Sequence, residues 1–114
     1  MDFKIGGWKA IAMIQLIEQA RADIERLCLE HHVKYLAVFG SATTSAFSPE
    51  SDVDLLVQFD DRLLARQYSA DYFALKAGLE TILGRDVDLV TMKSLNNPYF
   101  RDTVMSAQQA LYAA

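Results

Sequence analysis

Residues 51–59 read SDVDLLVQF, and this stretch decides which fold the rest of the sequence is compared with. The apolar run from Val53 to Phe59 is typical of a buried strand, yet aspartates stand at its opening, at positions 52 and 54. Aspartate is depleted in strands because a short charged side chain packs poorly on a pleated, half-buried surface. Since side chains alternate along a strand, Asp52 and Asp54 share one face and the apolar residues take the other. The stretch therefore predicts a core strand with two carboxylates on its polar face.

The segments around this strand alternate between extended and helical patterns. Upstream, apolar steps of three and four predict a helix over residues 8–31, and VKYLAVF predicts a strand over 33–39. Downstream, we expect a helix capped by Ser69 and closed by Gly84, and then a strand over 86–91. Asn97-Pro98 predicts the start of a last helix that includes Leu111, although Leu111-Tyr112 fits a short edge strand as well.

This order of elements predicts an α/β (α+β) fold, with a small mixed β-sheet of three to four strands flanked by helices. A length of 114 residues with 52% apolar and 23% charged residues suits a single domain over residues 1–114. No apolar run approaches the ~20 residues of a membrane helix, so we expect a cytoplasmic protein without membrane contact. The net charge of -4 argues against direct nucleic-acid binding.

Three residues near the end of the first helix are predicted to be structural. Cys28 continues the apolar stripe of the helix and is expected to be buried rather than to act as a nucleophile. His31 and His32 stand where a cation complements the helix dipole, which we favour over a catalytic role.

A third carboxylate occurs in the last predicted strand, where Asp88 is flanked by Val87 and Leu89. Placed beside Asp52 and Asp54 in the sheet, Asp88 would complete three oxygen ligands of the kind that Mg²⁺ prefers. The alternative is that each Asp-X-Asp segment merely decorates the surface. For Asp86, next to Gly84-Arg85, the exposed-turn interpretation is the better one.

A Gly-Ser pair ends the first predicted strand, in Phe39-Gly40-Ser41. Glycine allows the backbone to turn sharply and to approach a ligand closely. If a helix follows at once, its free N–H groups and the Ser41 hydroxyl would hold phosphate.

The pattern Phe39-Gly40-Ser41, ten residues, then Asp52-Val53-Asp54 resembles the signature of the minimal nucleotidyltransferase (MNT) family, within the DNA polymerase β-like superfamily. The later LGRDVDLVT, at residues 83–91, resembles the strand that carries the third carboxylate of that family. The resemblance extends over residues 33–112 and implies displacement of pyrophosphate from the α-phosphorus of a nucleoside triphosphate.

The resemblance also implies a role for each site residue. Asp52, Asp54 and Asp88 would be the catalytic metal ligands, for two Mg²⁺ ions or Mn²⁺ in their place.

The remaining site residues would bind the nucleotide, the substrate being ATP. They are Gly40 and Ser41, with help from the hydroxyls of Thr43 and Thr44. The family commonly has an arginine and a glycine where this chain has Thr44 and Ser45.

Small MNT proteins commonly act as antitoxins beside an all-helical HEPN ribonuclease toxin, which implies a hetero-oligomer with such a toxin. We therefore hypothesise an antitoxin-type protein adenylyltransferase that modifies a tyrosine of the toxin. The alternative is a catalytically weak antitoxin that neutralises the toxin by binding alone.

Overall fold

A computed structural model describes residues 3–39, 53–92, 95 and 97–114 of the chain. The element order is α1 (Phe3–Glu30), β1 (Val33–Phe39), β2 (Val53–Phe59), α2 (Ala65–Leu83), β3 (Val87–Thr91), α3 (Pro98–Ala107) and β4 (Gln109–Ala113). The strands form one four-stranded sheet in the order β3-β2-β1-β4. β1 runs antiparallel to both of its neighbours, whereas β2 and β3 are parallel. The predicted mixed α/β sheet is therefore confirmed.

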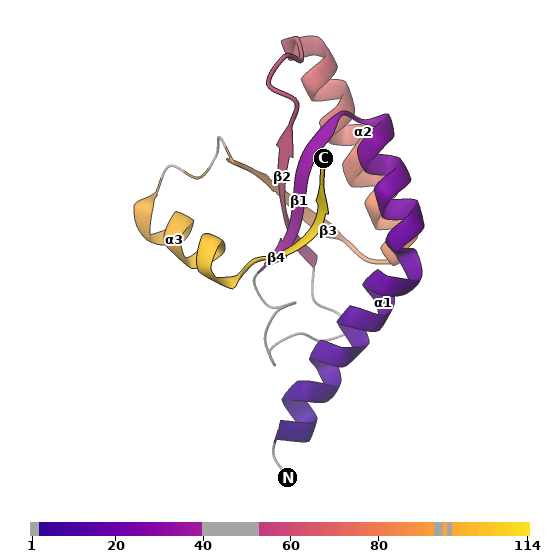
Figure 1. The fold of residues 1–114 in the computed structure, drawn as a ribbon, viewed down its shortest axis with the longest axis vertical. Helices are drawn as coiled ribbons and strands as arrows, with labels where there is room; N and C mark the ends of the chain where they lie inside the picture. Colours follow the sequence, from indigo (N-terminus) through magenta and orange to yellow (C-terminus); the bar gives the residue numbers. More distant parts are fainter. Residues whose placement is uncertain (1–2, 40–52, 93–94, 96) are drawn as a thin grey trace.

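The helices are distributed unequally over the two faces of this sheet (Figure 1). α1 and α2 lie together on one face, whereas α3 stands away from the sheet on the other side. The antiparallel β1–β2 pair joins consecutive strands, but the parallel β2–β3 pair needs a crossover, which α2 supplies. In the part of the chain that the structure describes, no helix is long and apolar enough to cross a membrane.

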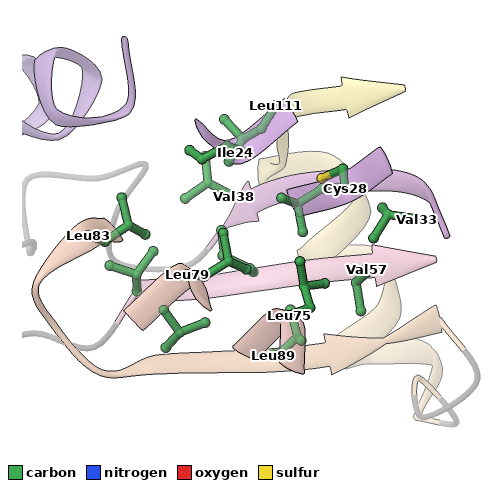
Figure 2. Close-up of a cluster of buried hydrophobic side chains, with 14 of the residues drawn as sticks. Ile24, Cys28, Val33, Val38, Val57, Leu75, Leu79, Leu83, Leu89 and Leu111 are labelled. Carbon is green, nitrogen blue, oxygen red and sulfur yellow. The ribbon is translucent and has the colours of Figure 1, made fainter. Parts of the chain in front are cut away.

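The main hydrophobic core lies between the sheet and the α1–α2 layer (Figure 2). Leu75 and Leu79, one turn apart on α2, are fully buried against Leu55 and Val57 of β2. Cys28 of α1 is fully buried in the same core, as predicted, and burial raises the pKa of its thiol to about 12. The thiol therefore stays protonated at neutral pH, and its role is packing.

The second predicted helix starts earlier than the sequence suggested. α2 begins at Ala65, so the prediction that Ser69 caps it was wrong, and its N-cap residue Leu64 makes no side-chain cap hydrogen bond. Packing holds this first turn instead, because the ring of Tyr68 meets that of Phe59 edge-on at a centroid distance of 5.0 Å. The predicted end is confirmed: Gly84 adopts the left-handed conformation at φ 68°.

The two ends of the chain also differ in part from the prediction. α1 starts at Phe3 rather than at residue 8 and continues through the two glycines at positions 6 and 7. At the other end, the Asn97 side chain accepts the N–H of Tyr99 at 2.9 Å, which confirms the predicted cap of α3. Leu111 is buried in β4, so the edge-strand alternative for the last residues is the one observed.

One polar cluster fastens the end of α1 to α2. Asp71 of α2 is only 3% exposed, and its carboxylate lies 3.3 Å from Nδ1 of His31 and 2.8 Å from Nδ1 of His32. Gln67, one turn earlier on α2, donates a third hydrogen bond at 3.2 Å. The two histidines, predicted to complement the helix dipole, therefore bind a buried carboxylate on a neighbouring helix instead.

The Asp71 cluster makes stability depend on pH. Burial alone would raise the pKa of Asp71, but hydrogen bonds from His32, Gln67 and His31 outweigh it and hold the pKa below its usual value. Because the folded-state pKa is lowered, the ionised carboxylate stabilises the fold above the pKa of the unfolded chain. That contribution is lost as the pH falls through the folded-state value.

We therefore expect Asp71→Asn to lower the free energy of unfolding at pH 7 by about 1–3 kcal/mol, measured by urea denaturation. The difference from the wild-type protein should begin to shrink as the pH falls below about 4, the usual aspartate pKa, and should be smallest below the lowered folded-state pKa, where the Asp71 side chain is neutral as well. Asp102→Asn, on the exposed surface of α3, is the matched control and should change little. Equal stability of Asp71→Asn and wild type at pH 7 would contradict this account.

Candidate active site

Two of the predicted carboxylates stand side by side at one end of the sheet. Asp54 of β2 and Asp88 of β3 are direct partners in the parallel register. Neighbouring strands lie about 4.8 Å apart, and residues in register point to the same face. Asp54 is half-buried and Asp88 is exposed, so both belong to a face that is open to solvent. The prediction that Asp88 lies beside Asp54 is confirmed.

A second, smaller hydrophobic cluster lies next to Asp54 on the same face of the sheet. Phe39, the last residue of β1, is the register partner of Asp54 on the other side of β2. Phe39 packs with Leu56 and Leu95 in a second hydrophobic cluster, on the sheet face opposite the main core. All three side chains are buried, so the two carboxylates lie at the margin of a packed apolar cluster that supports this end of the sheet.

Hydrogen bonds from two directions fix the start of β3, which carries Asp88. On the inner side, the N–H of Val53 donates to the carbonyl of Asp86 at 3.0 Å. On the outer side, the N–H of Val87 donates to the Glu80 carboxylate of α2, also at 3.0 Å. Tyr72, from the same helix, donates its hydroxyl to the carbonyl of Leu89 at 2.7 Å.

These contacts do two things at once. They bracket Asp88 on both sides along β3, and they satisfy polar groups on an edge strand that would otherwise be open to pairing. The sequence analysis missed both Glu80 and Tyr72. No spacing signal marks them, because α2 reaches the outer edge of β3 only after the crossover has formed.

Asp86 lies near the Lys76–Glu80 pair of α2 and does not belong to the candidate site. Hydrogen bonds from the Val87 N–H and from Lys76, the latter at 3.1 Å, lower the pKa of Glu80. The pKa of Lys76 is raised by its hydrogen bond to Glu80 and also by the nearby charge of Asp86. Asp86 is thus exposed on the side of α2, which agrees with the turn interpretation from the sequence.

The other predicted site residues cannot be placed. Asp52 and the predicted nucleotide-binding residues Gly40, Ser41, Thr43 and Thr44 lie outside the described residues. Among the residues that are described, no group of three or more His, Cys, Asp or Glu side chains is arranged to hold a metal ion. Asp54 and Asp88 therefore form a pair, and the three-carboxylate site stays a prediction.

The donor set of this pair fits a hard divalent cation. Carboxylate oxygens are the ligands that Mg²⁺ favours, and Mg²⁺ is typically bound by one or two carboxylates together with waters and substrate phosphates. The pair has no softer ligand beside it, since the buried Cys28 belongs to the core on the other face.

A small mixed sheet with one open face and aspartates in register on adjacent strands is the framework of a nucleotidyltransferase core. The sequence matches the family described as polymerase beta, nucleotidyltransferase over residues 22–114. The chain therefore belongs to the polymerase beta nucleotidyltransferase family and is a nucleotidyltransferase.

Individual relatives agree with this assignment. A Methanocaldococcus jannaschii protein named "Putative protein adenylyltransferase MJ1379" is 39% identical over 75 residues, 66% of this chain and 73% of its own length. A solved structure of a "putative minimal nucleotidyltransferase" is 32% identical with a TM-score of 0.64, covering 82% of this chain and 93% of that one.

A more distant structure shares the fold. It is a tri-AMPylated Shewanella oneidensis HEPN toxin in complex with MNT antitoxin. The similarity has a TM-score of 0.58 at 21% identity, and it covers 86% of this chain and 73% of that one.

The anchoring of β3 gives a local test of the site. Glu80→Ala should free the Val87 N–H, so that the amides of Val87 and Asp88 exchange with solvent at least about tenfold faster in NMR hydrogen exchange. Glu80→Gln keeps a hydrogen-bond acceptor, so its amide exchange rates should lie between those of Glu80→Ala and the wild type. Glu25→Ala, on the exposed surface of α1, is the control. Unchanged exchange in Glu80→Ala would show that β2 alone holds the start of β3.

Proposed function

We propose that this nucleotidyltransferase transfers AMP from ATP to a tyrosine hydroxyl of a partner HEPN ribonuclease toxin, and that it acts as an antitoxin. The observation that carries the proposal is the register of Asp54 with Asp88 on an open face of the sheet, directly beside the end of β1. The predicted phosphate-binding segment starts at Gly40, which is covalently joined to Phe39, the register partner of Asp54.

Each residue has a part in the proposed reaction. Gly40 and Ser41, with Thr43 and Thr44, hold the β- and γ-phosphates of ATP. Asp52 and Asp54 orient the triphosphate, and Asp88 faces the acceptor hydroxyl and helps to activate it.

In the transfer itself, the tyrosine oxygen forms a bond to the α-phosphorus as the bond to the bridging oxygen breaks. Pyrophosphate leaves, and the hydroxyl proton is lost from the tyrosine.

Two magnesium ions, held by Asp52, Asp54 and Asp88, would neutralise the charge that develops on the attacking and leaving oxygens of such an in-line displacement. The parts of the structure that support this are the paired carboxylates and their access to solvent. An acceptor as large as a folded toxin needs such an open approach, and Asp88 is the more exposed member of the pair.

The comparisons support a protein as the acceptor. The relative from Methanocaldococcus jannaschii carries protein adenylyl transfer in its name, and the Shewanella oneidensis complex contains an AMPylated HEPN toxin together with its antitoxin. An adenylate on the toxin adds bulk and negative charge, which would repel the phosphate backbone of an RNA substrate.

The second candidate is an antitoxin that acts by binding alone. The sequence of the predicted phosphate-binding loop favours it, because Thr44 and Ser45 replace the arginine and glycine common in the family. Loss of a cation would weaken the hold on phosphate. The retained aspartates at positions 52, 54 and 88 favour the enzyme, since a binder has no need of them.

Metal dependence is the first test. ATP with Mg²⁺ should raise the melting temperature, whereas ATP with EDTA should not. When the free concentration of ATP with Mg²⁺ is about 100 times its Kd, the free energy of unfolding should increase by roughly 2.7 kcal/mol.

Matched aspartate variants locate the effect. Asp54→Asn and Asp88→Asn should each lose the rise in melting temperature that depends on the metal. Asp86→Asn, two residues from Asp88 and outside β3, should keep it. Equal stabilisation by ATP in EDTA, or equal behaviour of Asp86→Asn and Asp88→Asn, would count against the site.

Covalent modification separates the two candidates. When a cognate HEPN toxin is incubated with a tenth of its molar amount of this protein, ATP and Mg²⁺, then re-isolated, its mass should increase by one or more AMP units on tyrosine. The toxin should also remain inactive after separation. Asp54→Asn should abolish the mass change and leave docking measurable by calorimetry. Unmodified toxin that regains full ribonuclease activity would establish the binding-only antitoxin.

A further inference from the structure

The two edge strands of the sheet, β3 and β4, differ in how their outward-facing backbone groups are hydrogen-bonded. At the β3 edge, side chains of Glu80 and Tyr72 bind the outward-facing polar groups of the strand. At the opposite edge, no residue of the described chain other than those of β1 hydrogen-bonds to the backbone of β4. In Figure 1, β4 is the strand nearest the viewer, and no helix lies in front of it. An open edge of this kind is a template for pairing with another strand.

The direction of the unpaired groups follows from the register. Ala114 donates its N–H to the carbonyl of Lys34 on β1 at 2.9 Å. Alternate residues of an antiparallel strand bond to the same neighbour, so the N–H and C=O of the intervening Ala113 point away from β1. Ala113 is exposed, and its methyl group leaves space for a close backbone approach.

The composition of β4 favours pairing of this edge with a second copy of the same strand. Residues 109–113 read QALYA, with no charge and no proline, although the whole chain carries a net charge of -4. Two copies of this strand can therefore meet across a two-fold axis without like-charge repulsion between the strands themselves.

One exposed leucine lies close to the end of this edge. Leu29 of α1 is 69% exposed and, together with Tyr112 of β4, lines a hollow of about 540 Å³, whose remaining lining is mixed and includes the charged residues Lys34, Asp60, Asp61 and Arg62. Leu29 lies about 200° around the helix from Leu27, whose methyl groups lie beside Gly78 of α2. The exposed leucine is thus turned away from α2, on the side where β4 is open.

We propose that β4 is a self-association edge, at which two copies of this chain pair antiparallel to form a continuous eight-stranded sheet. Asp54 and Asp88 lie on β2 and β3, away from this seam, so both candidate sites stay accessible in the dimer. The contact would be small, two five-residue strands with an exposed Leu29 near each, so we expect a weak dimer whose population depends on protein concentration.

Sedimentation velocity over about 5 to 500 μM tests this proposal. The wild-type sedimentation coefficient should rise from the monomer to the dimer value. Ala113→Pro removes the outward N–H and keeps the bonds to β1, an edge position where proline is tolerated, so this variant should stay monomeric. Ala113→Lys places like charges at the seam and should also stay monomeric. Ala77→Lys, on the exposed surface of α2, is the charge-matched control and should dimerise like the wild type.

Two results would overturn the proposal. The first is a wild-type chain that stays monomeric over the whole range, and the second is dimerisation of both Ala113 variants at wild-type strength. Circular dichroism checks the fold of each variant. Because Ala113→Lys keeps every backbone hydrogen bond, it decides the question if Ala113→Pro does not fold. Metal-dependent ATP stabilisation should be the same in all four proteins, so this test is independent of the proposed enzyme activity.

Discussion

The parallel pairing of β2 with β3 is the constraint on which the rest of the structure depends. Parallel neighbours cannot be joined by a tight turn, so the chain must cross over one face of the sheet, and α2 makes that crossover. Leu75 and Leu79 fasten the helix to the sheet by burial. The same pairing brings Asp54 and Asp88 together, because their strands run in the same direction and start at the same end of the sheet. The main core and the candidate site are thus consequences of a single pairing.

The two ends of the sheet differ in the environment of their carboxylates. At the end where β2 and β3 begin, the half-buried Asp54 and the exposed Asp88 stand in register, which brings two like charges close together. At the other end, the Asp71 carboxylate is buried and fully hydrogen-bonded to His31, His32 and Gln67. This second cluster fastens α1 to α2 and stabilises the helical layer against which the sheet packs. A fold with cohesive contacts at one end can tolerate unfavourable charge at the other, which is a common arrangement for a site that needs a ligand.

The open face of the sheet accounts for how so small a chain could act on another protein. α1 and α2 cover one face, and α3 stands away from the other, where Asp88 is exposed and Asp54 half-buried, so the paired aspartates can be approached from solvent. The β4 edge, at which the described residues show no backbone partner beyond β1, is a separate surface on the far side of the sheet from β3, so acceptor binding and self-association would not compete.

The sequence by itself determined the alternation of elements, the strand positions, the closing role of Gly84 and the burial of Cys28, since each follows from local patterns. It also identified Asp54 and Asp88 as unusual, because charge inside an apolar strand is visible without coordinates. It failed at the start of α2, where packing of Tyr68 on Phe59 takes the place of the cap expected from Ser69. It assigned His31 and His32 a structural role but could not identify their partner Asp71, which lies about 40 residues away in the chain. The register of Asp54 with Asp88, the anchoring of β3 by Glu80 and Tyr72, and the absence of a described neighbour of β4 other than β1 were visible only in the tertiary structure. These are relations between strands and helices distant in sequence, and they come into existence only when the crossover packs against the sheet.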